Sequence, residues 1–417
     1  MRRRQFLTNT ISALFLSSCS KKYLRLPASE SLTFVDDIPF VGPELKSRLV
    51  KNAIYSKDKK KYGKGRNARK FSNLKEIFPI GLRDLRSLNS DQLIMTDENY
   101  YTRTEKPNLL SIDELTHIQI TENFDNPIEL PIQRIISNSK ELGVTMMECA
   151  GNDKYSGFRL MSAARWGGVS IEEFINSNIF NTLKFNQKYS HVLISGFDDS
   201  TQSGYNWRGV QSTAGASWVF KIQDLLKQNA FLATEMNGKP LSIDRGYPCR
   251  LVVPGWYGCA SIKWVNKIVF FNANPYTATT SQMKEFADRT HQDGTPEIIS
   301  TYKNPIIDYT AIPIKVEKWK KTNGSFIYRV IGLQWGGKDQ SPDLRINISK
   351  NNVVTTKNQS VSSVKRDNLF SWQHWWYWWS PQDRGRFNVS LSLNNPNELT
   401  RRLDKNYYQQ SVKISEI

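Results

Sequence analysis

The sequence contains little cysteine and little histidine: its 417 residues include four of each. No Cys-x-x-Cys-His motif occurs, which excludes a covalently attached haem of the c type. His117, His191 and His374 occur singly, without metal-ligand spacing, so we interpret them as structural. After the first twenty residues no apolar run reaches eighteen residues, which excludes a later membrane-spanning helix.

Acidic residues are also scarce, since 39 Asp and Glu stand against 57 Lys and Arg and give a formal net charge of +18. Such a charge predicts attraction to anionic partners. Much of the excess lies in residues 46–70, which hold eleven Lys or Arg and one Asp. We interpret this segment as a solvated tether. Because no base-reading motif accompanies it, we expect no nucleic-acid partner.

The rest of the composition is that of a folded protein. Hydrophobic residues make up 39% and aromatic residues 12% of the chain. A chain of this length exceeds what one hydrophobic core usually holds. The numbers therefore predict two domains with additional terminal segments.

The N-terminus has the features of an export signal. Residues 2–7 read Arg-Arg-Arg-Gln-Phe-Leu, and a short apolar run and small residues follow before Cys19. The order of basic, apolar and small residues predicts a signal peptide over residues 1–19, of the twin-arginine type. Residues 16–19, Leu-Ser-Ser-Cys, are typical of a bacterial lipobox, which predicts a lipid anchor at Cys19 on the periplasmic side of a membrane. A plain secretory signal with an accidental cysteine is the alternative.

Three cysteines remain after the signal: Cys149, Cys249 and Cys259. An odd number in an oxidising compartment leaves at least one thiol outside any disulfide. We expect Cys149 to be the functional one, because it stands between an apolar strand and a Gly-Asn turn, where a loop can present its sulfur. Cys249 and Cys259 are interpreted as small buried side chains, with a disulfide between them as the second interpretation.

Hydrophobic patterning divides the chain further. Residues 20–75 are predicted to form a basic linker, and residues 76–300 a mixed α+β domain in which strands alternate with helices. A capping box between Ser170 and Glu173 predicts a helix start. Residues 301–417 show short alternating strands, which predict a β-sandwich. The tryptophan-rich run at residues 372–379 is interpreted as packing of this sandwich.

Five separated motifs follow one another in the middle of the chain: Glu-Cys-Ala-Gly-Asn at 148–152, Ala-Arg-Trp-Gly-Gly at 164–168, the segment 232–241, Arg-Gly-Tyr-Pro-Cys-Arg at 245–250 and Ser-Ile-Lys-Trp at 261–264. In this order they resemble the molybdopterin-binding domain of the sulfite oxidase family. The resemblance covers roughly residues 77–300. It extends more loosely to the C-terminal sandwich, which is similar to the immunoglobulin-like dimerisation domain of that family and implies a homodimer.

The resemblance implies a molybdenum-molybdopterin cofactor with the Cys149 thiolate as a metal ligand, which suits a soft, high-valent metal. The pterin ends in a phosphate, which calls for cationic side chains and backbone N–H groups. Asp198 matches a position that contacts the pterin ring, with a register uncertain by one residue because Asp199 follows it. The implied cofactor contacts are Thr102, Arg103, Thr104, Cys149, Asp198, Arg245, Arg250, Ser261, Ile262 and Lys263.

Substrate residues match the family less completely. Arg103 and Lys154 are expected to attract an anion, but Lys154 stands where the family has an arginine and therefore loses bidentate geometry. Thr104 and Glu105 replace the usual Asn and His, and Arg245 replaces a common His. The tyrosine expected after the phosphate cradle has no clear match, so the candidates there are Tyr276, Arg289 and His291.

The resemblance therefore implies an enzyme that transfers an oxygen atom, with Cys149, Arg103 and Lys154 as catalytic residues and sulfite or a related sulfur oxyanion as substrate. Electrons would leave through an external carrier such as cytochrome c, because the chain has no haem motif. One alternative is a reductase of sulfoxides such as oxidised methionine, from the same superfamily. Another is a metal-free binding lipoprotein that keeps the fold.

Overall fold

The computed structural model describes residues 31–41, 85, 88, 93–102, 115–123, 125–152, 158–180, 188–197, 216–274, 276–292, 294–339, 342–363, 368–395 and 397–417. The chain divides into two compact units. The central unit comprises Pro43–Arg83 and Ile94–Ile307, and the C-terminal unit comprises Met1–Gly42, Asp84–Leu93 and Asp308–Ile417. Among the described helices, none has the length and apolar character needed to span a membrane.

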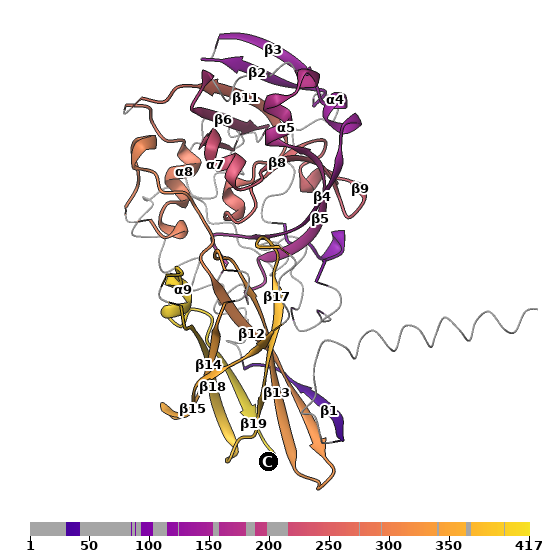
Figure 1. Ribbon diagram of the computed structural model, residues 1–417, viewed down its shortest axis with the longest axis vertical. Helices are drawn as coiled ribbons and strands as arrows, with labels where there is room; N and C mark the ends of the chain where they lie inside the picture. The colour runs from indigo at the N-terminus through magenta and orange to yellow at the C-terminus, as the bar shows by residue number, and fades with distance from the viewer. Residues whose placement is uncertain are drawn as a thin grey trace, which may run out of the picture. The chain divides into compact units, whose positions relative to one another are not determined.

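Two sheets of five strands each form the central unit (Figure 1). One has the order β10-β8-β5-β4 with β9 paired to β8, and the other has the order β3-β2-β11-β6-β7. Strands β11 and β2 pair in parallel, and the other pairings in these sheets are antiparallel. The strands are β2 (His117–Glu122), β3 (Asp125–Pro131), β4 (Lys140–Glu148), β5 (Met161–Ser170), β6 (His191–Gly196), β7 (Ser217–Lys221), β8 (Phe231–Met236), β9 (Lys239–Pro240), β10 (Arg250–Val252) and β11 (Val265–Phe271).

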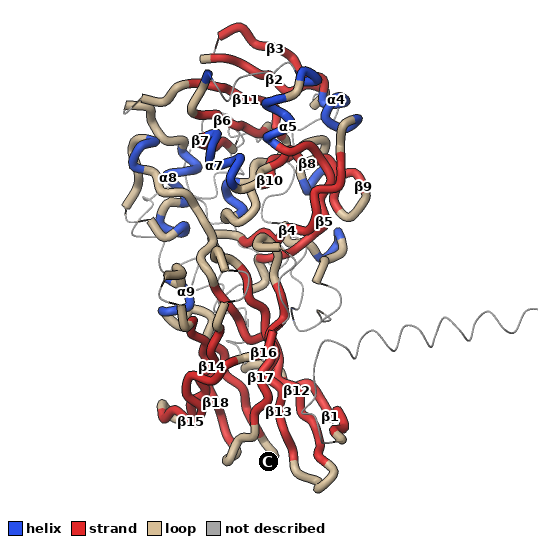
Figure 2. Tube along the Cα trace, in the orientation of Figure 1, coloured by secondary structure: helices blue, strands red, loops and turns tan. Residues whose placement is uncertain are grey.

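Helices in the described part of the central unit are short, so this unit is rich in sheet (Figure 2). The Ser170 hydroxyl accepts a hydrogen bond from the Glu173 N–H at 3.0 Å, which confirms the predicted helix start. The α-helices are α4 (Ile132–Ser137), α5 (Ile171–Asn176), α7 (Ile222–Lys227) and α8 (Ser281–Phe286). The 3-10 helices are η3 (Asp97–Asn99), η6 (Asn178–Phe180), η7 (Ile243–Arg245), η8 (Gly258–Ala260), η9 (Asp288–Thr290) and η10 (Ile299–Thr301).

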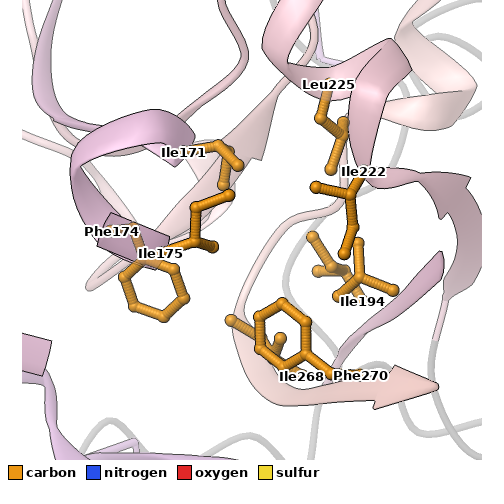
Figure 3. Close-up of a pocket in the computed structure, with 9 residues that line it drawn as sticks. Ile171, Phe174, Ile175, Ile194, Ile222, Leu225, Ile268 and Phe270 are labelled. Carbon is orange, nitrogen blue, oxygen red and sulfur yellow. The ribbon is translucent and has the colours of Figure 1, made fainter. Parts of the chain in front are cut away.

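Helices α5 and α7 pack their apolar side chains on strands β6 and β11, where the largest core cluster of the central unit lies. A cavity of about 10 Å³ remains between them (Figure 3). Its walls are wholly aliphatic or aromatic, formed by residues such as Phe174, Ile194, Ile222 and Phe270. A space of this size holds at most one water molecule and offers it no polar partner, so it is a packing gap in the core and not a ligand site.

Two antiparallel sheets form the C-terminal unit, with the orders β1-β12-β13-β17-β16 and β15-β14-β18-β19. Both sheets contribute to one hydrophobic cluster, so they face each other across a shared core. The elements are β1 (Leu32–Ile38), β12 (Thr310–Lys321), β13 (Phe326–Trp335), β14 (Leu344–Lys350), β15 (Val353–Ser360), β16 (Ser362–Ser363), β17 (Gln373–Trp379), β18 (Gly385–Leu393), α9 (Arg401–Asp404) and β19 (Gln410–Ile414).

The tryptophan-rich run forms strand β17, and Trp375 and Trp379 enter the shared core. This confirms the interpretation of the run as sandwich packing. Successive side chains of a strand point to opposite faces, so Trp376 and Trp378 lie on the outer face of the sheet, whereas Tyr377 packs against the shared core.

Strand β1 lies in the segment for which composition predicts a linker. Its seven residues pair antiparallel with β12 at the edge of a sheet, from Leu32 opposite Lys321 to Ile38 opposite Val316. Most of its residues are exposed. An edge strand with little burial lacks the alternating apolar pattern by which sequence reasoning finds strands, which explains why the linker interpretation did not include it.

Candidate functional site

Cys149 directly follows strand β4, which lies at the edge of its sheet. Its N–H donates a hydrogen bond to the Leu160 carbonyl at 2.9 Å, and its own carbonyl accepts one from the Asn152 N–H at 2.9 Å. The side chain is 7% exposed. The Gly151 N–H points at the sulfur, with a nitrogen-to-sulfur distance of 3.4 Å. A donor in this position favours the thiolate form that ligates metals.

Two buried polar side chains hold the turn that presents this sulfur. The Asn152 amide donates to Glu148 Oε1 at 3.1 Å and accepts from the Leu160 N–H at 3.1 Å. Glu148 and Asn152 are both fully buried. In the sequence these two residues only identify the motif, and no role is predicted for them. The signal was present, because two polar residues that flank a cysteine in an apolar context need partners when buried.

Arg245 connects the turn before β10 to the segment that holds Thr102. Its guanidinium donates to the Tyr101 carbonyl at 2.9 Å, to the Asp97 carbonyl at 2.6 Å and to the Thr102 hydroxyl. It also lies over the Tyr100 ring, 5.2 Å from the ring centre. The structure thus brings Thr102 and Arg245, two expected cofactor contacts, into direct contact.

Arg250, the first residue of β10, is 3% exposed. It donates to the Arg245 carbonyl at 3.0 Å, lies 3.6 Å from the Met147 sulfur and covers the Trp166 ring at 5.5 Å. Its Nε atom has no hydrogen-bond partner in the part of the chain that the structure describes. Burial lowers the pKa of both Arg245 and Arg250.

Lys263 lies beside these two arginines. Its ammonium donates to the Asp244 carbonyl at 2.6 Å and lies 5.0 Å from the centre of the Trp264 ring. Gly246 separates it from Arg250: a Cβ atom at Gly246 would stand 3.0 Å from the Arg250 Cβ and 3.2 Å from the Lys263 Cβ. Gly246 also has a φ of +106°, which L side chains rarely adopt. The backbone here therefore requires glycine to bring the cations together.

Ser261 and Ile262 form hydrogen bonds and packing contacts within the protein. The Ser261 hydroxyl accepts from the Val253 N–H at 3.2 Å, and the Ile262 side chain is 1% exposed within the core. The Ile262 carbonyl accepts from the Leu251 N–H at 2.7 Å. These contacts fix the chain next to Lys263, while the Ile262 side chain is not available to a ligand.

The cysteine and the arginines belong to one part of the central unit. Cys149 shares a hydrophobic cluster with Tyr101, Met147 and Trp166, and two of these, Met147 and Trp166, contact Arg250. Burial raises the pKa of Tyr101 well above its ordinary value, and the charge on Cys149 adds to this effect. The sulfur therefore lies near groups that contact the buried cations.

Four expected site residues, Arg103, Thr104, Lys154 and Asp198, lie outside the described residues, as does Cys19. Of the three candidates for the missing tyrosine position, the Tyr276 side chain is 89% exposed. His291 packs its ring against Tyr257 at 5.8 Å.

Cys249 and Cys259 are not joined by a disulfide. Cys249 is fully buried in the large core cluster, and burial raises the pKa of its thiol to about 12. Burial also raises the pKa of Cys259 well above its ordinary value, followed by the charge on Cys149. The raised pKa values favour the protonated form of both thiols. Within the described ranges, His, Cys, Asp and Glu side chains form no group of three that could hold a metal.

The residues fit an anionic, phosphate-bearing cofactor. A buried guanidinium is costly unless an anion compensates it, yet neither Arg245 nor Arg250 forms an ion pair with a carboxylate within the described residues. The orphaned Nε of Arg250 supplies one donor for such an anion. Within the described residues, the Cys149 thiolate belongs to no group of three candidate ligands, which suits a metal whose other ligands come from the cofactor itself.

Comparison with known proteins shows which families and relatives the chain is similar to. The model of the family described as "Oxidoreductase molybdopterin binding domain" matches residues 108–278. The chain is 34% identical over 120 residues to the mitochondrial sulfite oxidase of Drosophila melanogaster, covering 28% of this chain and 17% of that protein. It is 25% identical over 205 residues to the sulfite oxidase of Gallus gallus, covering 46% of this chain and 42% of that protein.

Other relatives of the chain are nitrate reductases. The chain is 29% identical over 196 residues to the NADPH nitrate reductase of Fusarium oxysporum, covering 43% of this chain and 20% of that protein. The alignments thus span less than half the length of these curated relatives. Among solved structures, the sulfane dehydrogenase SoxCD of Paracoccus pantotrophus superposes with a TM-score of 0.56 at 13% identity, covering 87% of this chain and 95% of that one. That likeness concerns the fold.

Proposed function

We propose that this protein oxidises sulfite or a related sulfur oxyanion and passes the electrons to an external carrier. The chain belongs to the sulfite oxidase family of molybdopterin-binding oxidoreductases, which supports this proposal. One observation carries this proposal. The Cys149 sulfur lies at a strand end with a backbone N–H directed at it, in the same cluster as residues that contact the buried guanidinium of Arg250. A soft ligand beside a cationic cradle is what a molybdenum-pterin group requires.

Each residue has a distinct task in this proposal. Arg245, Arg250 and Lys263 would hold the pterin phosphate, and Gly246 lets their backbones approach. Cys149 would ligate the metal through its thiolate, which Gly151 N–H stabilises. Asp198, with Thr102, Arg103 and Thr104, is proposed to contact the cofactor.

When bound, the cofactor supplies the oxygen-atom transfer and accepts two electrons. The protein's contribution is to bind, orient and shield. Arg103 and Lys154 are proposed to draw in the anionic substrate, and the buried cluster around Tyr101 and Trp166 keeps water away from the sulfur.

Two other reactions compete with this proposal. The nitrate reductase relatives favour reduction of nitrate, another oxyanion. Reduction of sulfoxides, the alternative within the superfamily, uses a neutral substrate that needs fewer cations. The buried arginines and the net charge of +18 favour an anionic substrate over a sulfoxide.

The test uses the full chain exported from a host that makes the cofactor. We expect about one molybdenum per chain, with sulfite-dependent reduction of cytochrome c. Nitrate-dependent or sulfoxide-dependent oxidation of a reduced dye, without sulfite turnover, would assign the other reaction. A chain without molybdenum that folds normally would favour a metal-free binding protein.

A variant tests the ligand itself. Cys149→Ser should lower turnover by at least about 100-fold, since even residues that only support metal ligands cost 10- to 100-fold when mutated. Its circular dichroism should match the wild type. Cys249→Ala is the matched control, because it removes a buried thiol that lies in a different core cluster. Equal activity of Cys149→Ser and wild type would contradict the proposal.

Location, assembly and domain boundaries are proposals as well. The arginines at residues 2–4 and the lipobox cysteine Cys19 support export and a lipid anchor on the periplasmic side. The two-sheet C-terminal unit supports an immunoglobulin-like domain and a homodimer through it. The divisions at residues 1–19, 20–75, 76–300 and 301–417 stay predictions. Palmitate labelling and mass determination in solution test the anchor and the dimer.

A further inference from the structure

Arg289 lies beside Cys149, although 140 residues separate them in the sequence. Both approach Gly151: the position of a Cβ atom on Gly151 is 3.7 Å from Arg289 Nη1 and 3.8 Å from Cys149 Sγ. The sulfur and the guanidinium therefore face one small space that the missing side chain of Gly151 leaves open. From the sequence, Arg289 is only one of three candidates for a tyrosine position.

The backbone that carries Arg289 is held in place. Arg289 is the middle residue of η9, directly after helix α8. The Thr290 hydroxyl donates to the Phe286 and Ala287 carbonyls at 3.1 Å, and the Gln292 side chain bonds both the N–H and the carbonyl of Lys303. Because these hydrogen bonds join the turn to two neighbouring segments, the Arg289 backbone has a defined position.

The side chain is also oriented. The Arg289 guanidinium lies over the Phe286 ring, 5.3 Å from the ring centre. Stacking on an aromatic face leaves the edge of the planar guanidinium, where its N–H donors are, directed away from the ring. That edge includes Nη1, the atom that faces Gly151 and the sulfur.

We infer that Arg289 binds the oxyanion substrate next to Cys149 and supplies a bidentate donor pair. This inference rests on the proposed function and adds a substrate-binding residue to it. A tetrahedral oxyanion with two oxygens in one plane matches the guanidinium fork, which a lysine ammonium does not. Arg245 and Arg250, assigned above to the cofactor phosphate, also donate to backbone carbonyls, whereas Arg289 Nη1 approaches the same glycine as the Cys149 sulfur.

The experiment measures sulfate binding by calorimetry, because sulfate has the shape and charge of the oxidised product. The full-length protein is compared with Arg289→Gln, Arg289→Lys and Arg384→Gln. Arg384 is an exposed arginine of the C-terminal unit and is not one of the proposed site residues, so its variant carries the same charge change as Arg289→Gln at a surface position. Molybdenum content is determined separately for each protein.

We expect Arg289→Gln to raise the sulfate dissociation constant at least tenfold, which corresponds to about 1.4 kcal/mol. Arg289→Lys should fall between this variant and the wild type, and Arg384→Gln should stay within about twofold of the wild type, because salt screens an exposed surface charge. Unchanged sulfate binding in Arg289→Gln, an equal loss in Arg384→Gln, or a wild type that binds no sulfate would each overturn the inference.

Gly151→Ala provides an independent variant. Its methyl group would meet Arg289 and Cys149 at 3.7 and 3.8 Å, ordinary contact distances, so the protein should fold normally. The methyl would still fill the shared space, and sulfate binding should weaken as in Arg289→Gln. Normal sulfate affinity in this variant contradicts the inference even if Arg289→Gln fails to fold.

The two proposals fail in different ways. If sulfite is turned over and the KM and kcat of Arg289→Gln equal those of the wild type, Arg289 is not a substrate residue although the proposed function stands. If the wild type contains molybdenum and binds sulfate through Arg289 but does not oxidise sulfite, the anion site is confirmed and the proposed reaction is wrong.

Discussion

At the residue scale, the cysteine turn depends on one amide. Asn152 satisfies both the Glu148 carboxylate and the Leu160 N–H, and all three groups are shielded from water. Removing one partner of a buried polar group leaves the other unsatisfied, which costs more than the hydrogen bond itself contributes. The amide therefore supports the turn that presents the Cys149 sulfur.

Asn152→Ala should lower the free energy of unfolding by about 1 to 3 kcal/mol and increase the rate at which a maleimide labels Cys149 in metal-free protein. Asn138→Ala is the control, since the Asn138 amide donates to the Arg134 carbonyl at 2.7 Å on the exposed end of α4. Urea unfolding and mass spectrometry of the labelled peptide measure the two effects. Destabilisation without faster labelling would show that Asn152 supports the fold but does not position the sulfur.

At the element scale, a buried ion pair joins neighbouring strands of the C-terminal unit. Arg329 of β13 donates to Glu317 of β12 at 2.8 Å, and Lys315 lies 3.1 Å from the same carboxylate. The guanidinium also lies between the Trp319 and Trp378 rings, at 5.2 and 5.3 Å from their centres. These contacts hold one cross-strand position on the outer face of the sheet.

Arg329→Gln should destabilise the protein by about 3 to 5 kcal/mol, because it leaves the Glu317 carboxylate buried without its main partner. Arg345→Gln is the matched control. Arg345 pairs with Asp343 where the two side chains are 24% and 40% exposed, so its loss should cost at most about 1 kcal/mol. Chemical unfolding curves decide this, and equal midpoints for the two variants would show that the buried pair contributes nothing.

At the scale of the whole molecule, the net charge has the longest-range effect on other molecules. The formal net charge of +18 exceeds what the site needs for one oxyanion. A strongly charged protein attracts an oppositely charged partner over about a Debye length, roughly 10 Å at 0.1 M salt. Under the proposed function, an external electron carrier is the partner that such a field would attract.

The rate of reduction of an acidic electron carrier should therefore fall several-fold as ionic strength rises from about 0.01 to 0.2 M, as screening shortens the reach of the field. Stopped-flow mixing of sulfite-reduced protein with an acidic cytochrome c measures it. Ferricyanide, a small anion, should show the same direction, and a neutral dye should show none. A rate that rises with salt would indicate a basic partner.

The amino-acid sequence by itself showed the resemblance to the sulfite oxidase family and the local elements that carry strong patterns. The motifs around Cys149 and Arg250 are local, the capping box at Ser170 is a contact over three residues, and the alternation of the C-terminal strands records which faces are buried. Each of these signals lies within a short stretch of chain, which is why it could be recognised without coordinates.

Only the tertiary structure showed which side chain approaches the Cys149 sulfur and which strand pairs with the edge of the β12 sheet. The approach of Arg289 to Gly151 and the pairing of β1 with β12 join residues more than 100 positions apart. The contact of Arg245 with Thr102 is of the same kind. Chain folding creates such contacts through packing over long sequence separations, and no local pattern of residues encodes them.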